Sequence, residues 1–487
     1  MTAIPFDNSY ARLPDAFFAR VMPARVPEPS LLKVNETLAE QLGLDTAWLY
    51  SEEGVSMLSG NLLPSNAEPI SMAYAGHQFG GWVPQLGDGR AILLGEILDK
   101  NGVRHDIQLK GSGRTPFSRR GDGKAALGPV LREYLVSEAM AALGVPTTRS
   151  LAVMLTGETV SRDTLLPGAI LTRVAQNHVR VGTFQYFYAR EDWESLRTLT
   201  DYIISRDYPH VQQAQNPYLA FLTAVVERQA TLIAKWMCIG FIHGVMNTDN
   251  MQIAGETIDY GPCAFMDNFH PEKVFSSIDQ YGRYAWNQQP VIAQWNLMRL
   301  AETLIPILGD VKEKAIQVKK VINQFNSLFN RHLLQGFSNK LGLLAEDSNE
   351  EIIKETFSIM TENEVDFTLF FRQLTRITTG ESEKDFLALL ASPESGKEWL
   401  LKWRKCISDD AVPNADRIAL MRQANPIFIP RNHRIEAVIK SAVQGNFKPF
   451  HLLAKILSHP YEVQPKHASF ESPPKPEEVV CQTFCGT

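Results

Sequence analysis

The chain has few cysteines, no excess of basic residues and no long apolar run. Five cysteines among 487 residues do not make the disulfide framework of a small secreted protein. Lysine and arginine number 48 against 54 aspartates and glutamates, and the resulting net charge of -6 argues against nucleic acid as a partner. No apolar run reaches the roughly 20 residues that a membrane-spanning helix needs, so we expect no membrane partner.

The N-terminus lacks the basic residues followed by an apolar stretch that mark a secretory signal. It instead carries Asp7 between two prolines, Pro5 and Pro14. We therefore expect a cytoplasmic protein. At 487 residues the chain is long enough for two lobes or two domains of about 150 residues or more.

Strand-like and helical stretches occupy different parts of the chain, which predicts an α+β fold. A first helix is expected over residues 30–43, because leucines recur there at helical spacing before Gly43. Strand patterns follow, and amphipathic helical runs dominate the later half. The expected divisions are an N-terminal extension (1–65), a strand-rich lobe (66–185), a helical lobe (186–458) and a tail that is flexible or laid across the surface (459–487).

The segment after an apolar helix is the part of the chain around which we expect a functional site to be organised. The helix is expected to continue to Ile242, and Gly244 then breaks the helical pattern. Two short strands, 251–253 and 257–260, are expected to pair as a hairpin around Gly255.

Three oxygen donors, Asp249, Asn250 and Asp259, lie at this hairpin. Asn250 opens the hairpin and Asp259 closes it, so antiparallel pairing would bring the two side chains together. Carboxylate and amide oxygens are the ligands that a hard divalent cation prefers. The sequence therefore predicts a magnesium clamp.

A glycine-rich turn between two strands is a candidate phosphate-binding loop. It contains Gly87 and Gly89, which let backbone amides approach a phosphate, and Arg90, which adds a positive charge. The strand expected over residues 105–110 ends at Lys110. Its ammonium group is therefore a candidate partner for the same phosphates.

A helix expected over residues 128–144 carries two glutamates, Glu133 and Glu138, and either could reach Lys110. We choose Glu133, because it lies nearer the start of the helix. Two further strands follow the helix. This order of elements predicts an antiparallel sheet with one helix packed on it.

The order of these features resembles protein kinases: a glycine loop, a strand lysine, a helix glutamate, a His-to-Asn loop and an Asp-x-Gly motif. His243 and Asn250 hold the outer positions of the loop, and Asp-Tyr-Gly at 259–261 replaces Asp-Phe-Gly. The kinase catalytic aspartate would fall at Val245, which has no proton-accepting group. A conventional phosphotransferase with Asp249 as the substitute base and an inactive ATP-binding scaffold are both compatible with this resemblance.

Longer motifs resemble the selenoprotein O family over most of the chain. They are YAGHQFGGWVPQLGDGRA (74–91), QLKGSGRTPFSRRGDGKAALGPVLREY (108–134), HGVMNTDNM (243–251) and IDYGP (258–262). The resemblance implies a kinase-like bilobal fold with an antiparallel-sheet N-lobe and a mostly helical C-lobe. It also implies a protein adenylyltransferase that binds ATP in a reversed orientation, uses Mg²⁺ or Mn²⁺, and transfers AMP to Ser, Thr or Tyr hydroxyls of proteins, including itself.

The same resemblance assigns roles to residues by motif position. Asp249 would accept the proton of the attacking hydroxyl, while Asn250 and Asp259 would hold the metal. Lys110, oriented by Glu133, would meet the phosphates. The residues implied for ATP binding are Gly87, Gly89, Arg90, Lys110, Asp122, Gly123, Arg173, Arg180 and Asp259.

Two cysteines close to the C-terminus, Cys481 and Cys485, suggest a redox or disulfide role and give only weak support for zinc. The resemblance places Cys485 third from the end, where many eukaryotic members have selenocysteine. Some bacterial relatives pair the tail cysteine with one shortly after Asp-Tyr-Gly, and the only cysteine near that position here is Cys263. Pairing of Cys481 with Cys485 is the alternative.

Overall fold

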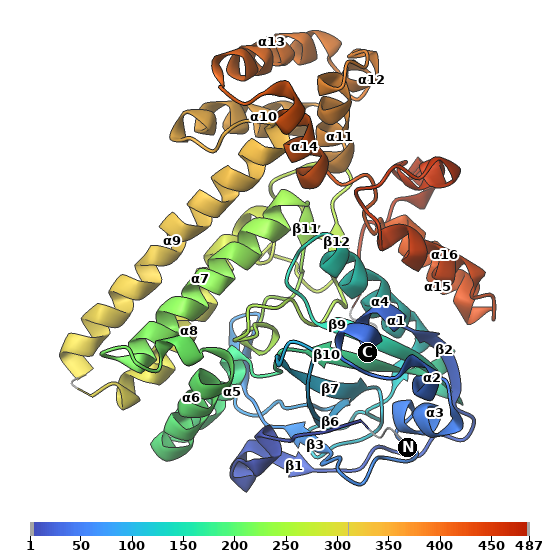
Figure 1. Cartoon of the computed structure of the whole chain (residues 1–487), viewed down its shortest axis with the longest axis vertical. Helices are drawn as coiled ribbons and strands as arrows, with labels where there is room; N and C mark the ends of the chain where they lie inside the picture. Colours follow the sequence, from blue (N-terminus) through green and yellow to red (C-terminus); the bar gives the residue numbers. More distant parts are fainter. Residues whose placement is uncertain (1–3, 310, 485–487) are drawn as a thin grey trace.

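The computed structural model describes residues 4–309 and 311–484 and combines an antiparallel sheet with many helices. The strands come from the first part of the chain, and most helices come from the rest, as expected for an α+β protein. Figure 1 shows the long helices on one side of the sheet, with α10–α14 beyond one end of α9 and α15 and α16 returning toward the sheet.

The large sheet is antiparallel, with the strand order β1-β3-β6-β7-β10-β9-β2 and with β8 paired to β10. The strands of this sheet are β1 (Phe18–Arg20), β2 (Ser30–Val34), β3 (Ile70–Met72), β6 (Ala91–Leu98), β7 (Arg104–Lys110), β8 (Ala125–Ala126), β9 (Arg149–Ser161) and β10 (Leu165–Ala175). Two small two-stranded sheets stand apart from it, β4 (Gly76–Gln78) with β5 (Gly81–Val83), and β11 (Phe241–Ile242) with β12 (Ala264–Phe265).

The sheet is covered on both faces. Alternate residues of a strand point in opposite directions, so neighbouring apolar residues can pack into two different cores. On β6, Leu93 belongs to a core shared with α4 (Leu127–Ala142), which packs on β9 and β10. Ile92 and Leu94 belong instead to a second core, formed with the small N-terminal helices α1 (Glu36–Gln41), α2 (Thr46–Leu49) and α3 (Glu52–Leu58). The N-terminal extension thus closes the face of the sheet that α4 leaves open.

The helix predicted over residues 30–43 is wrong in its first half. Ser30–Val34 form β2, which pairs with β9, and α1 begins only after Asn35, whose side chain accepts a hydrogen bond from the backbone N–H of Leu38. Leu31 and Leu32 contact opposite cores, which is the side-chain pattern of a strand. Pairing with β9 therefore overrides the helical spacing of the leucines.

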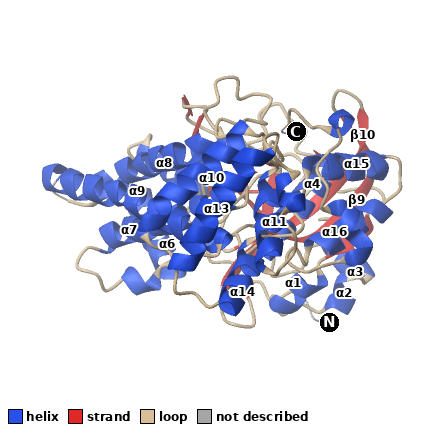
Figure 2. Ribbon diagram, turned by 90° about the horizontal axis from the view of Figure 1, so that it is seen from above, coloured by secondary structure: helices blue, strands red, loops and turns tan. Residues whose placement is uncertain are grey.

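The remaining helices form the larger part of the molecule, and Figure 2 shows the longest of them gathered away from the strands. Those helices are α5 (Val181–Tyr188), α6 (Trp193–Asp207), α7 (Pro217–Cys238), α8 (Gln289–Leu304), α9 (Val311–Leu341), α10 (Glu350–Glu362), α11 (Phe367–Thr378), α12 (Lys384–Leu387), α13 (Pro393–Asp409), α14 (Asn414–Ala424), α15 (Asn432–Val443) and α16 (Lys448–Leu457). The apolar helix predicted to reach Ile242 ends earlier, at Cys238. Gly240 has a φ of 69° there, and the next two residues form β11.

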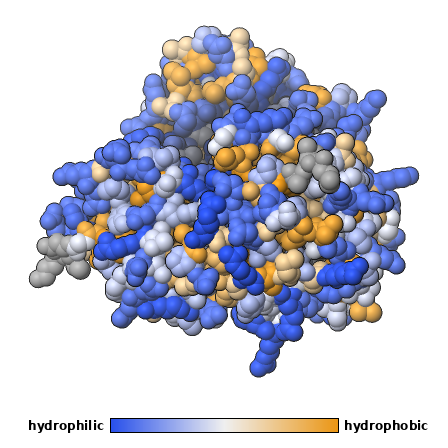
Figure 3. All heavy atoms as spheres, turned by 60° about the horizontal axis from the view of Figure 1, so that its bottom comes forward, coloured by the Kyte–Doolittle hydropathy of each residue, from blue (hydrophilic) through white to orange (hydrophobic). Residues whose placement is uncertain are grey.

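No helix within the described ranges is long and apolar enough to cross a membrane. Figure 3 shows one face of the molecule, on which hydrophilic side chains predominate and hydrophobic ones gather in small patches.

Candidate active site

A cavity of about 1100 Å³ opens between the sheet and the segment that joins α7 to α8. The residues that the sequence predicts for ATP, metal and catalysis come from separate parts of the chain between Gly87 and Asp259, and the fold brings all of them to this cavity. Those lining residues are Gly87, Gly89, Arg90, Lys110, Asp122, Gly123, Glu133, Arg173, Arg180, Asp249, Asn250 and Asp259.

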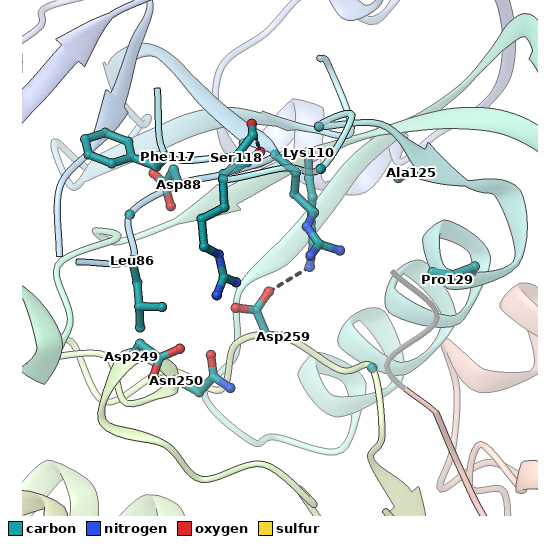
Figure 4. A pocket seen from close by; sticks show the side chains of 18 of the residues that line it. Leu86, Asp88, Lys110, Phe117, Ser118, Ala125, Pro129, Asp249, Asn250 and Asp259 are labelled. Carbon is teal, nitrogen blue, oxygen red and sulfur yellow. Dashed lines mark hydrogen bonds and ion pairs between the residues drawn. The ribbon is translucent and has the colours of Figure 1, made fainter. Parts of the chain in front are cut away.

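Lys110 lies at the end of β7 and bridges two carboxylates. Its Nζ lies 2.6 Å from Glu133 Oε2 on α4 and 2.7 Å from Asp259 Oδ1 (Figure 4). Glu138, the other glutamate considered for this contact, binds Arg149 at 2.7 Å instead. Five residues along α4, about 1.4 turns, therefore separate a carboxylate inside the cavity from one outside it.

Arg173 joins the same cluster from β10, the strand paired with β7. Its Nη1 lies 2.8 Å from Asp259 Oδ1 and 3.2 Å from Glu133 Oε1, and its Nε and Nη2 donate to Gln108 Oε1. The arginine side chain is only 2% exposed. Because both of its edges are held by hydrogen bonds, it provides a positive charge in a fixed position.

Asp259 is held in the ionised state by its neighbours. Burial alone would raise the pKa of this carboxyl, but the charges of Lys110, Arg173 and Arg180 hold the pKa well below its ordinary value. The backbone at Asp259 has a φ of 63°, a left-handed conformation that aspartate and asparagine tolerate better than most residues. Its carboxylate is therefore charged and rigidly directed into the cavity.

Arg180 connects the glycine turn to the His-to-Asn loop of residues 243–250, which we call the catalytic loop after its resemblance to that of kinases. It lies over the ring of Tyr74 at 4.4 Å, its Nη1 donates to the Asp249 carbonyl at 3.1 Å, and its Nη2 lies 3.5 Å from Asp88 Oδ1. The sequence reasoning missed Asp88 and Tyr74. The sequence signal that could have identified Asp88 is its place between the two glycines of the turn, while its burial and its contact with Arg180 appear only in the structure.

Asp249 and Asn250 lie in a single turn of 3-10 helix, Thr248–Asn250, on the other side of the cavity (Figure 4). Within the described chain, Asp249 Oδ1 is buried without a hydrogen-bond partner, and Oδ2 has only a 3.4 Å contact with Gln78 Nε2. Burial raises the pKa of Asp249 to about 6, although the nearby Arg180 lowers it. Asp249 thus has a free acceptor oxygen and a stronger affinity for a proton than an ordinary aspartate.

The hairpin predicted between 251–253 and 257–260 is wrong. Gln252 pairs with Arg180, and Thr257 pairs with Thr147, so the two arms of the turn at Gly255 bind different neighbours rather than each other. The turn is nevertheless tight, because Gly255 N–H donates to the Gln252 carbonyl at 3.2 Å. Asn250 and Asp259 reach the same cavity through these tertiary contacts and not through a local strand pair.

His243 has a structural position below the catalytic loop. Its ring is fully buried, stacks on Trp236 with centroids 5.3 Å apart, and its Nε2 lies 2.8 Å from the Ile258 carbonyl. It therefore ties the start of the loop to the segment that carries Asp259. Val245, at the position of the kinase base, lines the cavity with an apolar side chain.

The glycine turn is packed against the basic loop that follows Lys110. Gly87 has a φ of 88°, and a Cβ built on it would lie 2.3 Å from Cγ of Phe117. Thr115 Oγ1 donates to the Asp88 carbonyl at 2.7 Å, and Ser118 Oγ donates to the Gly89 carbonyl. The glycines are thus required by the close approach of Phe117 as well as by the shape of the turn.

We expect Gly87→Ala to destabilise the protein more than Gly102→Ala does. Gly102 has a similar φ of 78° but nothing within 4 Å of the built Cβ, so its substitution carries only the backbone cost of about 1 kcal/mol. At Gly87 the overlap with Phe117 should add about 1–3 kcal/mol to the loss of unfolding free energy. Denaturant unfolding of the two variants measures this difference, and equal losses would show that Phe117 moves aside without cost.

Asp122 and Gly123 lie at the tip of the basic loop. The Asp122 carboxylate forms an ion pair with Arg162 at 2.9 Å and accepts from the backbone N–H of Lys124, and the hydrogen bonds from Arg162 lower its pKa. Both oxygens therefore have protein partners. The exposed Arg119 and Arg120 of the same loop also line the cavity and add positive charge at its rim.

The donors at the cavity fit one hard cation shared with a polyphosphate. No group of three or more His, Cys, Asp or Glu side chains in the described residues is arranged as a complete metal site. Asn250 uses its Nδ2 to donate to the Val245 carbonyl at 3.0 Å, which leaves its Oδ1 as an acceptor, and Asp259 Oδ2 has only a distant cation, Arg180 at 3.9 Å. Magnesium commonly takes one or two protein oxygens and fills its other positions with phosphate and water.

The C-terminal segment lies against the segment that follows Asp259. The Thr483 N–H donates to the Phe275 carbonyl at 2.8 Å, and the Ser277 N–H donates to the Thr483 carbonyl at 3.0 Å. Cys263 is a buried thiol whose pKa is raised to about 12, mainly by burial. Cys481 is exposed, while Cys485, and with it any pairing of the two tail cysteines, lies outside the described residues.

Comparisons with known proteins agree on one family. The family model described as "Protein adenylyltransferase SelO" matches residues 1–458. Three similar proteins, each named "Protein nucleotidyltransferase YdiU", come from Bradyrhizobium sp. (strain BTAi1), Rhodopseudomonas palustris (strain BisB5) and Rhizobium meliloti (strain 1021). They are 56%, 57% and 55% identical to this chain over 486, 487 and 491 residues, and each alignment covers at least 99% of both proteins.

Proposed function

The chain belongs to the SelO family of protein adenylyltransferases, and from this premise we propose how its cavity transfers AMP from ATP to hydroxyl side chains of proteins. It is a protein nucleotidyltransferase with ATP and proteins as substrates. We further propose that Asn250 and Asp259 hold a divalent cation, Mg²⁺ or Mn²⁺. ATP binds in the reversed orientation, and the acceptors are the hydroxyl groups of Ser, Thr or Tyr.

The single observation that carries this proposal is that cationic side chains converge on Asp259 while the free carboxylate lies away from the position of the kinase catalytic base. Lys110 and Arg173 converge on Asp259 at 2.7 and 2.8 Å, as a polyphosphate and metal site requires. Val245 leaves the usual kinase base position apolar, and the free carboxylate in the cavity belongs to Asp249. A base in this different place suits attack on a different phosphorus atom.

The arrangement of elements supports a kinase-like bilobal fold. Residues 66–185 contain most of the antiparallel sheet and α4, residues 186–458 contain the long helices, and the cavity draws on both. The segment before residue 66 would be an extension that covers the sheet, and the segment from residue 459 onward a tail outside the two lobes. In this division the ATP site lies between the two lobes.

Each proposed role follows from charge and position. Asp249 accepts the proton of the attacking hydroxyl while a bond forms from that oxygen to the α-phosphorus and the bond to the bridging oxygen breaks, which releases pyrophosphate. Lys110, Arg173 and Arg180 stabilise the negative charge that develops on phosphate oxygens. A bound divalent cation would add charge neutralisation at the phosphates.

The remaining residues orient these groups. Glu133 holds Lys110, and the glycine turn with Arg90 and the rim arginines provides further donors for the phosphates. Because the carboxylate of Asp122 is paired with Arg162, we propose that Asp122 and Gly123 act by shaping the loop. Water exclusion by this loop would favour transfer to a protein hydroxyl over hydrolysis.

The experiment that tests this function is the intact mass of the protein after incubation with ATP and Mg²⁺ or Mn²⁺. We expect a gain of about 329 Da, one adenylyl group, rather than the gain of about 80 Da that phosphoryl transfer produces. Parallel reactions with α-labelled and γ-labelled ATP, in the presence of added proteins, should transfer only the α label. Transfer of the γ label would overturn the proposal in favour of a phosphotransferase, and no transfer of either label would favour a scaffold.

A further inference from the structure

A group of aromatic and arginine side chains lies on the surface next to the cavity and has no part in the proposed ATP site. We call it the aromatic–arginine platform and define it by His77, Trp82, Arg283, Trp295 and Arg299. These residues come from the β4–β5 hairpin, from the segment after Asp259 and from α8.

The β4–β5 hairpin is fixed to the catalytic loop by hydrogen bonds. The backbone N–H of His77 donates to Thr248 Oγ1 at 2.7 Å, and the N–H of Phe79 donates to Asn247 Oδ1 at 2.9 Å. The platform therefore has a defined position relative to Asp249, the residue after Thr248. Phe79 holds a φ of 50°, a strained conformation that these contacts maintain.

The platform side chains pack against one another, with the His77 ring tilted toward Trp82 and edge-on to Trp295. The ring of His77 lies 4.9 Å from Trp82 and 5.2 Å from Trp295. The guanidinium groups of Arg283 and Arg299 lie 5.0 and 5.1 Å from the Trp295 ring. Stacking on tryptophan orients a guanidinium without neutralising it, so Arg283, which has no ion-pair partner among the described residues, stays available for a carboxylate.

The platform carries net positive charge. Arg299 has an ion pair with Glu302 at 2.6 Å, whereas Arg283 has no ion-pair partner among the described residues. The nearest carboxylate in sequence, Asp279, is buried and accepts from the backbone N–H groups of Arg283 and Tyr284. A local excess of arginine on a chain of net charge -6 marks a surface that attracts anions.

The platform is continuous with the cavity and is partly apolar. Gln78 and Phe79 on the hairpin, and Ile278 on the segment after Asp259, line the cavity itself. Trp82 is 40% exposed, and Tyr281, in the same segment as Arg283, is 96% exposed. A chain lying across this surface would pass directly from the platform to Asp249.

From this juxtaposition we propose that the aromatic–arginine platform docks an acidic segment of the protein substrate and delivers the neighbouring hydroxyl to Asp249. The inference rests on the proposed function, because it names the class of protein that the same site modifies. Guanidinium groups recognise carboxylates through paired hydrogen bonds, and exposed aromatic rings bind the flanking apolar side chains. The substrate class is therefore a Ser, Thr or Tyr flanked by Asp or Glu.

Two synthetic peptides test the proposal. Both carry one acceptor tyrosine, and its neighbours are glutamates in one peptide and lysines in the other. We expect kcat/KM for AMP transfer from α-labelled ATP to be at least about tenfold higher for the glutamate peptide at low salt, and the difference to shrink as salt rises. Equal rates for the two peptides would overturn the docking proposal while the adenylyltransferase function stands.

Charge-reversal variants locate the effect on the platform. The double variant Arg283→Glu/Arg299→Glu should raise KM for the glutamate peptide about tenfold or more and improve the lysine peptide, with kcat at saturating peptide little changed. Arg283→Lys/Arg299→Lys should keep most of the preference. Lys320→Glu/Arg331→Glu, the same total charge change at two exposed positions of α9, is the matched control and should leave the preference unchanged.

Different results would contradict the platform assignment and the adenylyltransferase function. A preference that survives the double reversal in a folded variant, checked by thermal unfolding, would place acidic recognition elsewhere and overturn the platform assignment. If the wild-type protein labels neither peptide and its own intact mass does not change, the proposed function fails and the docking inference fails with it.

Discussion

Replacing Asp259 by asparagine should reduce AMP transfer roughly 1000-fold, because it removes the one carboxylate on which Lys110, Arg173 and the proposed cation converge. Asparagine keeps the size of the side chain and tolerates the left-handed backbone, with its φ of 63°. The measurement is the rate of incorporation of α label from ATP under saturating metal. Binding of Mn²⁺ in the presence of a non-hydrolysable ATP analogue should weaken in parallel.

The same variant should be less stable but folded. Arg173, which is 2% exposed, loses a carboxylate partner at 2.8 Å but keeps Glu133 at 3.2 Å and its bonds to Gln108. We therefore expect a loss below the about 3–5 kcal/mol that a fully broken buried ion pair costs. Asp259→Ala should lose about 1 kcal/mol more through backbone strain. Full turnover in a folded Asp259→Asn protein would refute its assignment to the metal.

Asp249→Asn should lower kcat by about 100- to 1000-fold, because it removes the group proposed to accept the hydroxyl proton. The substituted amide fits the same space, since Oδ1 has no partner within the described chain and Oδ2 has only the 3.4 Å contact with Gln78. Single-turnover AMP transfer to a saturating protein substrate measures the chemical step. Affinity for ATP should change much less than kcat, because Arg180 contacts the backbone carbonyl of this residue and not its carboxylate.

Stability distinguishes a catalytic role of Asp249 from a structural one. Burial raises the pKa of this carboxyl to about 6, so its ionised form costs free energy in the folded protein at neutral pH. Asp249→Asn removes that cost, and its melting temperature should equal or exceed that of the wild type. A variant that is inactive because it unfolds would argue for a structural role, and one that retains wild-type kcat would exclude Asp249 as the base.

The sequence predicted the chemistry of the site more accurately than its local structure. Lys110, Glu133 and Asp259 were assigned from motif order, and the structure places Lys110 Nζ 2.6 Å from the Glu133 carboxylate and 2.7 Å from the Asp259 carboxylate. The hairpin proposed to join Asn250 to Asp259 does not exist. Motif order reflects which side chains meet, whereas strand pairing depends on segments such as Thr147 and Arg180 that are remote in sequence.

The predicted boundaries of helices and strands were wrong where tertiary strand pairing competed with the local spacing of apolar residues. Residues 30–34 have leucines at helical intervals, but an open strand edge on β9 accepts them as β2. The end of α7 was placed too late, because Phe241 and Ile242 are apolar in a helix and in a buried strand alike. Neither outcome is encoded in the residues nearby.

The amino-acid sequence by itself determined the family, the α+β class and the set of side chains at the cavity, because these depend on residue types in a given order. Only the tertiary structure decided that Asp88 faces Arg180, that Phe117 packs on Gly87, and that the aromatic–arginine platform exists. His77 and Trp295 are separated by more than two hundred residues, and no local pattern relates them. Contacts of this kind arise when the sheet and the helices close around the same cavity.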